Sequence, residues 1–359
     1  MGSLSDYAEN SLINHIFNTA YTSVATVYVC LCTADPTDAA TGASQSEVAN
    51  ANGYARTAVT FSAAATRKVQ QTGAVTFPQA SGTWGTITHW TIADSATYGA
   101  GNVLAHGAFT ASFAPVAGNT PTIPSGEIQV QMLATHYTAG TISAAAADNS
   151  LNDSANGFPL FPVGAVLYIS GFTGSAGNNG AATIVSSTVS KIVIANAGSP
   201  PGITLVNDAA GESVRVSLSG GLSDYAVHSL FNRMFRNQAF TKPATYVGLA
   251  TVIIDDNDVA AGDITEASGT AYARVLVNPN AGAAPKWTVA TTGALDNVDA
   301  ITFPTPGATW GTITSCFLID SASGAGNVLG YDNGSVQDQT VAANDTVQFA
   351  IGAFDVSLT

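Results

Sequence analysis

The feature that most constrains the fold of this 359-residue chain is an internal repeat. Short blocks of sequence in the first 133 residues return in the same order in the last 140, always 218 to 226 positions later. Chance does not preserve order and spacing together, so the chain holds two copies of one unit. The clearest pairs are LSDYA at 4–8 and 222–226, YAR at 54–56 and 272–274, TFP at 76–78 and 302–304, TWGTIT at 83–88 and 309–314, and GNVL at 101–104 and 326–329.

The repeat divides the chain into three predicted units: a first copy at 1–133, a second copy at 220–359, and a segment at 134–219 that matches neither. A chain of this length is long enough for each copy to bury a core of its own. The sequence therefore predicts a mainly β protein, in which two homologous β-sandwich or barrel-like domains, each opened by one α-helix, are separated by a small β-domain.

Each copy is expected to begin with a helix. In the first copy, Asp6 and Glu9 have the spacing of a helix start, and Tyr7, Leu12 and Ile16 fall near one helical face. Strands separated by turn residues follow, because alternating β-branched and aromatic residues recur between Gly, Pro, Asn and Asp. The expected strands of this copy are 26–33, 54–61, 73–77, 87–93, 103–109 and 127–133.

The middle segment has two predicted parts. Residues 138–157 are rich in Ala, Asn, Asp and Ser, which favours a linker or an extended arm. Strands are expected at 166–170, 182–187, 191–195 and 213–218, with a glycine-rich hairpin turn between the first two. This part predicts a compact β-domain of about 60 residues.

Charge argues against several partners. Only 9% of the residues are charged, the net charge is −14, and the ten Lys and Arg residues are scattered. No basic stripe exists to neutralise a phosphate backbone, so neither nucleic acid nor an anionic membrane is an expected partner. No apolar run approaches the length of a membrane span, and the start MGSLSDYAEN does not resemble a signal peptide. We expect synthesis in a bacterial cytoplasm without export by a standard route.

No metal or cofactor site is expected. The three cysteines, Cys30, Cys32 and Cys316, cannot form a disulfide framework and fit buried apolar positions better than a metal site. The one acidic cluster, between Asp255 and Glu266, departs from the register of a calcium loop, which favours a solvated loop. We therefore expect thermal stability to be insensitive to chelators.

No catalytic residue is expected either. The five histidines, His15, His89, His106, His136 and His228, do not stand beside a nucleophile or a second ligand. The chain shows no nucleophile elbow, phosphate loop or dinucleotide fingerprint. These observations predict a protein that is not an enzyme.

Aromatic and basic residues that recur in both copies are predicted to be structural anchors. Trp84 and Trp310 stand at the same place before a β run, which suits a shared packing need in the core. The other predicted anchors are Tyr7 with Tyr225 and Arg56 with Arg274.

The motifs SLSDYAEN at 3–10, TADPTD at 33–38, GYAR at 53–56 and TWGTITH at 83–89 together resemble a bacteriophage protein family usually described as tail-fibre or virion structural proteins. The resemblance covers both copies, although the second copy departs at 253–258, where it lacks TADPTD. The middle segment is similar to small β-modules inserted in phage tail proteins. The resemblance implies a location in the virion and brings no catalytic residues.

Three functions remain open from the sequence. The first is a tail-associated structural protein of the fibre or fibre base, bound to other virion proteins. The second is a capsid decoration or cement protein bound to the major capsid protein. The third, a receptor module that binds or hydrolyses sugar, predicts exposed aromatic clusters and paired carboxylates at matched positions, which the sequence lacks.

We also predict a homotrimer, because three chains with two similar domains each can occupy the six positions of a sixfold surface. In that arrangement, contact with a neighbouring chain is expected to order residues 138–157.

Overall fold

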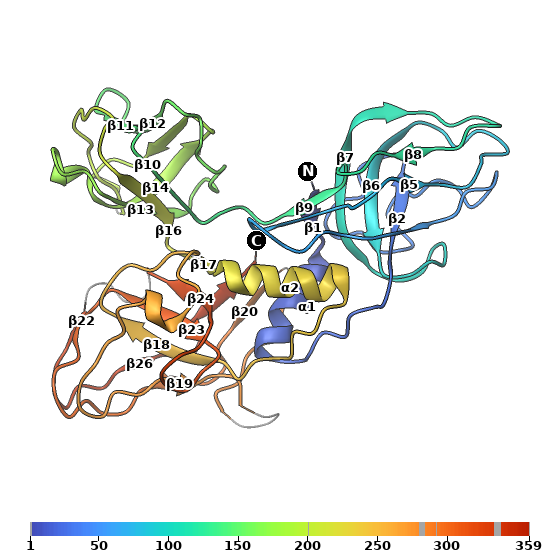
Figure 1. Ribbon diagram of the computed structural model, residues 1–359. Coiled ribbons are helices and arrows are strands. Elements are labelled where there is room, and N and C mark those ends of the chain that lie inside the picture. The colour runs from blue at the N-terminus through green and yellow to red at the C-terminus, as the bar shows by residue number, and fades with distance from the viewer. Residues whose placement is uncertain (1, 200, 280–283, 292, 334–338, 359) are drawn as a thin grey trace.

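The computed structural model describes residues 2–199, 201–279, 284–291, 293–333 and 339–358. It is mainly β, with two copies of a helix-plus-sheet unit and a separate β-rich unit formed by the chain segment that connects them (Figure 1). The fold class expected from the sequence is confirmed. Among the described residues, neither helix is long or apolar enough to cross a lipid bilayer.

The first copy combines one helix with one large sheet. Seven strands pair in the order β3-β2-β6-β7-β1-β9-β4, and β5 pairs separately with β8. The elements are β1 (Gly2–Leu4), α1 (Asp6–Phe17), β2 (Val27–Cys32), β3 (Thr57–Val59), β4 (Lys68–Gln70), β5 (Val75–Thr76), β6 (Ile87–Ala93), β7 (Val103–Phe113), β8 (Thr122–Ile123) and β9 (Gln129–Gln131).

The second copy repeats this order with its own strands. Its five-stranded sheet, β17-β24-β23-β18-β19, follows the order of β1-β7-β6-β2-β3, and β20 pairs with β27 as β4 pairs with β9. Two further pairs are β21 with β26 and β22 with β25. The elements are β17 (Gly220–Leu222), α2 (Asp224–Arg236), β18 (Tyr246–Ala250), η2 (Ala261–Asp263), β19 (Val275–Leu276), β20 (Ala294–Asp296), β21 (Ile301–Thr302), β22 (Gly311–Ile313), β23 (Ser315–Ile319), β24 (Val328–Asp332), β25 (Gln339–Val341), β26 (Gln348–Phe349) and β27 (Asp355–Ser357).

The LSDYA motif starts the helix in each copy through its serine rather than through an acidic pair. The Ser5 hydroxyl accepts a hydrogen bond from Ala8 N, and Ser223 does the same with Ala226 N, both at 3.2 Å. Each serine is the N-cap, so an exposed backbone N–H of the first turn is satisfied. The helix start predicted at Asp6 is one residue from this cap, and a short strand, β1 or β17, precedes each helix.

The two copies share one main core, although the second copy has a smaller cluster of its own around Ile254 and Phe317. One continuous hydrophobic cluster contains buried side chains of both, including Leu12 and Trp90 from the first copy and Leu230 and Trp310 from the second. The expectation that each copy buries its own core is therefore wrong. Each helix contacts both copies: α1 contacts β7 of its own copy and β20 of the other, and α2 contacts β24 of its own copy and β4 of the other. Figure 1 shows both helices between the two β-rich copies.

The middle unit has its own core of buried residues, such as Ile142, Leu151 and Leu167. Its seven strands pair in the order β10-β16-β13-β14-β15-β12-β11. The elements are β10 (His136–Ala139), β11 (Ile142–Ala145), β12 (Ser150–Asp153), β13 (Val166–Ser170), η1 (Ala176–Asn178), β14 (Gly180–Ser187), β15 (Lys191–Ile194) and β16 (Val214–Leu218).

The expectation of a linker or arm at 138–157 is wrong, because these residues form half of β10 and all of β11 and β12. Ile142 and Leu151 are fully buried, and Asn149 takes a left-handed conformation, with φ of 51°, just before β12. The segment whose composition resembles a linker therefore forms short strands with a few buried apolar side chains, Ile142, Ala144 and Leu151. The segment is ordered by its own chain, which overturns the expectation that a neighbour orders it.

Candidate functional site

The YAR motif of the first copy forms a buried ion pair. Arg56 Nη2 lies 2.8 Å from a carboxylate oxygen of Glu47, and the two side chains are 0% and 4% exposed. The Tyr54 hydroxyl donates to Glu47 at 2.8 Å and accepts from Leu31 N at 3.0 Å. The Arg56 guanidinium also donates to three loop carbonyls, those of Gly42, Ser95 and Ala100. The motif thus fastens two loops to the edge of the sheet, the one between β2 and β3 and the one between β6 and β7.

The second copy repeats this arrangement. Arg274 Nη2 lies 2.7 Å from Glu266 and donates to Gly324 O at 3.2 Å. Tyr272 donates to Glu266 at 2.8 Å, and its oxygen accepts from Leu249 N at 2.9 Å. The pairing of these arginines was not predicted: Glu47 was not named, and Glu266 was assigned to a solvated loop, although the two glutamates stand nine and eight residues before their partners.

The two predicted tryptophan anchors are buried at matching positions. Trp84 is 5% and Trp310 is 3% exposed. Trp84 Nε1 donates to Asn52 O, and Trp310 Nε1 donates to Thr270 O, at 2.9 and 3.2 Å. Each indole meets the tyrosine of the YAR motif edge-on, with ring centroids 5.3 and 5.1 Å apart. The structure therefore brings the Trp and Arg anchors together in each copy.

The tyrosines of the LSDYA motif lie apart from these anchors. Tyr7 is 37% exposed, whereas Tyr225 is partly buried and packs edge-on against Phe240. In α1 the buried side is formed by other residues, among them Ala8, Leu12 and Ile16. Tyr7 is thus not on the buried face where the periodicity placed it.

A charged junction joins the three units around Arg67, which is 4% exposed. Its guanidinium contacts Asp224 at 3.1 Å and Asp256 at 3.4 Å, both in the second copy. It also donates to Leu222 O at 3.0 Å and to Leu133 O at 2.9 Å. A side chain of the first copy thereby satisfies groups at both ends of the middle unit.

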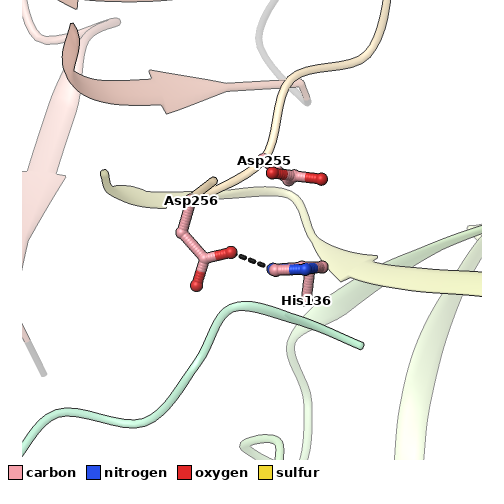
Figure 2. Close-up of side chains that lie close together, drawn as sticks. All are labelled: His136, Asp255 and Asp256. Atoms are coloured by element: carbon pink, nitrogen blue, oxygen red, sulfur yellow. Dashed lines mark hydrogen bonds and ion pairs between the residues drawn. The ribbon is translucent and has the colours of Figure 1, made fainter. Parts of the chain in front are cut away.

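The middle unit enters this junction through His136, the first residue of β10. Figure 2 shows its ring directed at the Asp256 carboxylate, to which Nδ1 is hydrogen-bonded. The neutral tautomer with the proton on Nδ1 leaves Nε2 to accept from Asn257 Nδ2, 3.0 Å away. Thr135 N donates to the second Asp256 oxygen at 2.7 Å.

These contacts shift two pKa values in opposite directions. The hydrogen bond to Asp256 raises the pKa of His136, although burial opposes it. Burial alone would raise the pKa of Asp256, but the bonds from His136 and Thr135 N and the charge of Arg67 lower it. The junction therefore favours an ionised aspartate beside a histidine that is readily protonated.

His136, Asp255 and Asp256 could hold a metal by distance, since one ligand atom of each lies within 4.8 Å of the others. The arrangement fits a salt-bridge network better. Arg215 lies 2.9 Å from Asp255, and Arg67 lies against Asp256, so these cations neutralise the carboxylates. Within the acidic loop, Asp255 Oδ1 accepts from Asn257 N, and Asp263 Oδ2 accepts from Ala260 N, so these oxygens cap the backbone.

Sequence analysis did not single out Arg67 or His136. A usable signal existed: the adjacent bases Arg67 and Lys68 and the acidic doublet Asp255-Asp256 each occur in only one copy. Basic residues found only in one copy and acidic residues found only in the other indicate an ion pair between the copies. The pairing partner nevertheless depends on how the chain folds back on itself.

The fold and these two kinds of site define a class: a duplicated β-rich structural protein whose polar clusters fasten its own loops and units together. The family model described as podophage GP4 fiber I protein gp80 matches residues 3–131 and 221–357, which are the two copies. The chain belongs to this family, and it is a component of the phage virion. A search of the curated proteins found no match.

Proposed function

We propose that the chain is a non-enzymatic structural subunit of the phage tail fibre or its base. The observation that carries the proposal is the family match over both copies, because the matched residues include every loop anchor and both helices. The clusters of polar residues support it, since Arg56, Glu47 and their counterparts are turned into the protein rather than toward a substrate. The chain is proposed to bind other virion proteins, and neither nucleic acid nor a membrane.

A receptor module that binds sugar is the weakest alternative. Such sites present aromatic faces to solvent. All four tryptophans are buried, with exposures of 0 to 7%: Trp84, Trp90, Trp287 and Trp310. The exposed carboxylates Asp296 and Asp355 face each other in the second copy, but the first copy has Gln70 and Gln129 at that register. Paired carboxylates at matched positions are thus missing there.

The proposal is tested by locating the chain on the tail or on the head of the virion. Purified virions of the phage that encodes the chain are labelled with gold-conjugated antibody against the middle unit, and the copies per virion are counted by quantitative mass spectrometry. Gold at the tail with tens of copies supports the proposal. Gold over the head with hundreds of copies supports a decoration protein, and absence from the virion contradicts both.

We further propose a homotrimer in the virion, formed through surfaces other than the contact between the two copies. That internal contact is reciprocal, and a reciprocal contact closes on itself, so it cannot also propagate a ring. Light scattering of the purified chain, together with cross-linking in virions, tests the stoichiometry. A monomer or dimer by both methods contradicts it.

A further inference from the structure

The two copies differ at one strand contact. In the first copy β1 pairs in parallel with β9 through Gly2 and Val130, which joins the strands into one seven-stranded sheet. The corresponding strands of the second copy, β17 and β27, lie in separate sheets. The second copy therefore contains an open gap where the first copy is closed.

The hydrogen bonds show which backbone groups face this gap. Ser223 N donates to Leu329 O and Ser219 O accepts from Asn333 N, so these residues use the β24 side of β17. Alternation along a strand then turns the backbone groups of Gly220 to the other edge. On β27, Leu358 N donates to Gly293 O, so Ser357 presents its N–H on the edge away from β20.

One substitution between the copies helps to keep the gap open. Trp90 of the first copy lies under β1, and a Cβ built on Gly2 would be 2.3 Å from its Cη2 atom. The same sheet position in the second copy holds Cys316, which faces Leu249 as Trp90 faces Leu31. A thiol fills far less of the core than an indole, so the residue at this position does not support β17 as the Trp90 ring supports β1.

A cavity of about 470 Å³ borders the gap, and residues of the first copy and of the middle unit also line it. Gly220–Leu222 and residues 355–358 line it, as do three acidic side chains, Glu9, Asp332 and Asp355. Exposed apolar side chains, Leu133 and Leu160, stand among the lining residues. Arg67 also reaches the lining, but its guanidinium is already paired with Asp224 and Asp256.

Two of these acidic side chains, Glu9 and Asp355, are held in an environment that disfavours their negative charge. Burial, with the charges of Asp38 and Asp6, raises the pKa of Glu9 to about 7. The hydrogen bond with Asp296 raises the pKa of Asp355. A positive charge entering the cavity would relieve this repulsion.

We propose that this gap receives an extended segment of another virion protein, which carries a Lys or Arg toward the acidic lining and pairs with the free edge of β27. This inference rests on the proposed function and adds the chemistry of the partner. Main-chain pairing along a strand edge supplies the affinity, and alternate side chains supply the specificity.

A second copy of this chain is the less suitable occupant. Its one pair of adjacent basic residues is Arg67-Lys68, and Arg67 is buried in the junction of its own chain. Arg56 and Arg274 are likewise committed to internal ion pairs. The chain has no segment with basic residues at alternate positions, so we assign the basic strand to a different protein.

Zero-length carbodiimide cross-linking of intact virions tests the proposal, because it joins a lysine to a carboxylate in direct contact. We expect Glu9, Asp332 or Asp355 to be linked to a lysine of a different virion protein. Links only to this chain, or no link from these residues, would overturn the inference. If the chain is absent from virions, the proposed function fails instead, so the two failures are distinct.

A matched pair of variants tests the strand pairing with the purified full chain. Ser357→Pro removes the N–H that faces the gap, whereas Ser357→Ala keeps it. A fluorescent six-residue peptide of alternating Lys and Val is the probe, and the same peptide with Glu for Lys is its control. We expect the Lys peptide alone to bind, Ser357→Ala to bind equally, and Ser357→Pro to bind about tenfold more weakly at an unchanged melting temperature.

Equal binding of both peptides, no binding of either, or equal binding by both variants contradicts the proposal. If Ser357→Pro lowers the melting temperature, a second experiment with the wild-type chain replaces it. In that experiment the Lys peptide must protect Glu9, Asp332 or Asp355 from carbodiimide labelling with a small amine. Absence of that protection overturns the inference.

Discussion

Phe17, at the end of α1, packs against Trp287 of the other copy, with 4.4 Å between ring centroids. The reciprocal contact joins Phe235 of α2 to Phe61 of the first copy at 5.3 Å. Two asparagines make a second pair of reciprocal contacts between the copies: the Asn14 side chain accepts a hydrogen bond from Ala290 N, and the Asn232 side chain accepts one from Ala64 N. Because each partner lies at the repeated position of the other, the copies are related by an approximate twofold exchange of helices.

This exchange predicts that the two copies unfold together. Trp287→Ala is expected to cost about 3–5 kcal/mol, because it leaves a cavity beneath α1. Denaturant unfolding followed by tryptophan fluorescence should show one transition at a lower midpoint, and this signal reports on the two copies because they contain all the tryptophans. The control is Val289→Ala, at a side chain 74% exposed, which should leave the midpoint unchanged. Two separate transitions in Trp287→Ala would show that the copies fold independently.

The loop anchor predicts a large effect from loss of one charge. Glu47→Gln leaves the Arg56 guanidinium buried without a counter-ion, at an expected cost of about 3–5 kcal/mol. Thermal melting measures the change. The exposed pair Asp148 and Lys191 offers a matched control, and Asp148→Asn should give the wild-type melting temperature. Equal effects of the two variants would argue against the anchor.

The junction predicts a pH-dependent stability. A raised pKa in the folded state means that protonated His136 stabilises the protein fully below its ordinary pKa of 6.5, and that this stabilisation is lost as pH rises through the folded pKa. His136→Gln should therefore lower the melting temperature more at pH 5.5 than at pH 9. His89→Gln, outside the junction, controls for the loss of a ring. A difference that does not change with pH would contradict the ion pair.

Removal of the Glu9 charge is predicted to stabilise the protein, whereas the substitutions above destabilise it. Its counterpart in the second copy is the fully buried Val227. With its pKa raised to about 7, Glu9 favours folding in its protonated form, and this stability is lost as pH rises from about 4.5 through about 7.

At pH 8, Glu9→Gln should therefore be about 1–2 kcal/mol more stable than wild type, after allowing for solvent screening at a half-buried site. The two should be equal at pH 4. Urea unfolding at both pH values provides the measurement. Loss of any negative charge reduces the self-repulsion of a chain with a net charge of −14. The control is therefore Asp35→Asn, at a side chain 65% exposed, whose gain in stability is compared with that of Glu9→Gln. A gain no larger than that of this control would refute the assignment.

The attachment of the middle unit predicts that it can be removed. Leu218 N donates to Thr135 O at 2.7 Å, and β10 pairs antiparallel with β16, so the two connections lie side by side. Replacement of residues 136–217 by Asn-Gly should close a tight turn and leave both copies folded, with one cooperative transition. The melting temperature should fall, because His136 is lost from the junction. A chain that no longer folds would show that the middle unit is required by the copies.

The local features were predictable because they depend on neighbours in the sequence. The strands at 87–93 and 166–170 coincide with β6 and β13, since each is a short run of β-forming residues between turn signals. Recurrence in both copies likewise predicted that Trp84 with Trp310 and Arg56 with Arg274 are structural anchors. The fragment S-L-x-N-x-x-F, at 11–17 and 229–235, was an unused signal for the helix exchange.

The amino-acid sequence by itself determined the duplication, the β-rich class, the helix in each copy and the family, because these follow from local pattern and from blocks that recur. Only the tertiary structure decided that the copies share a core, that Arg67 meets Asp224 and Asp256, and that the sheet of the second copy is open between β17 and β27. These relationships join residues more than 130 positions apart. Which of many compatible surfaces pack together is set by the total burial and charge pairing of the folded chain, and no local pattern encodes that choice.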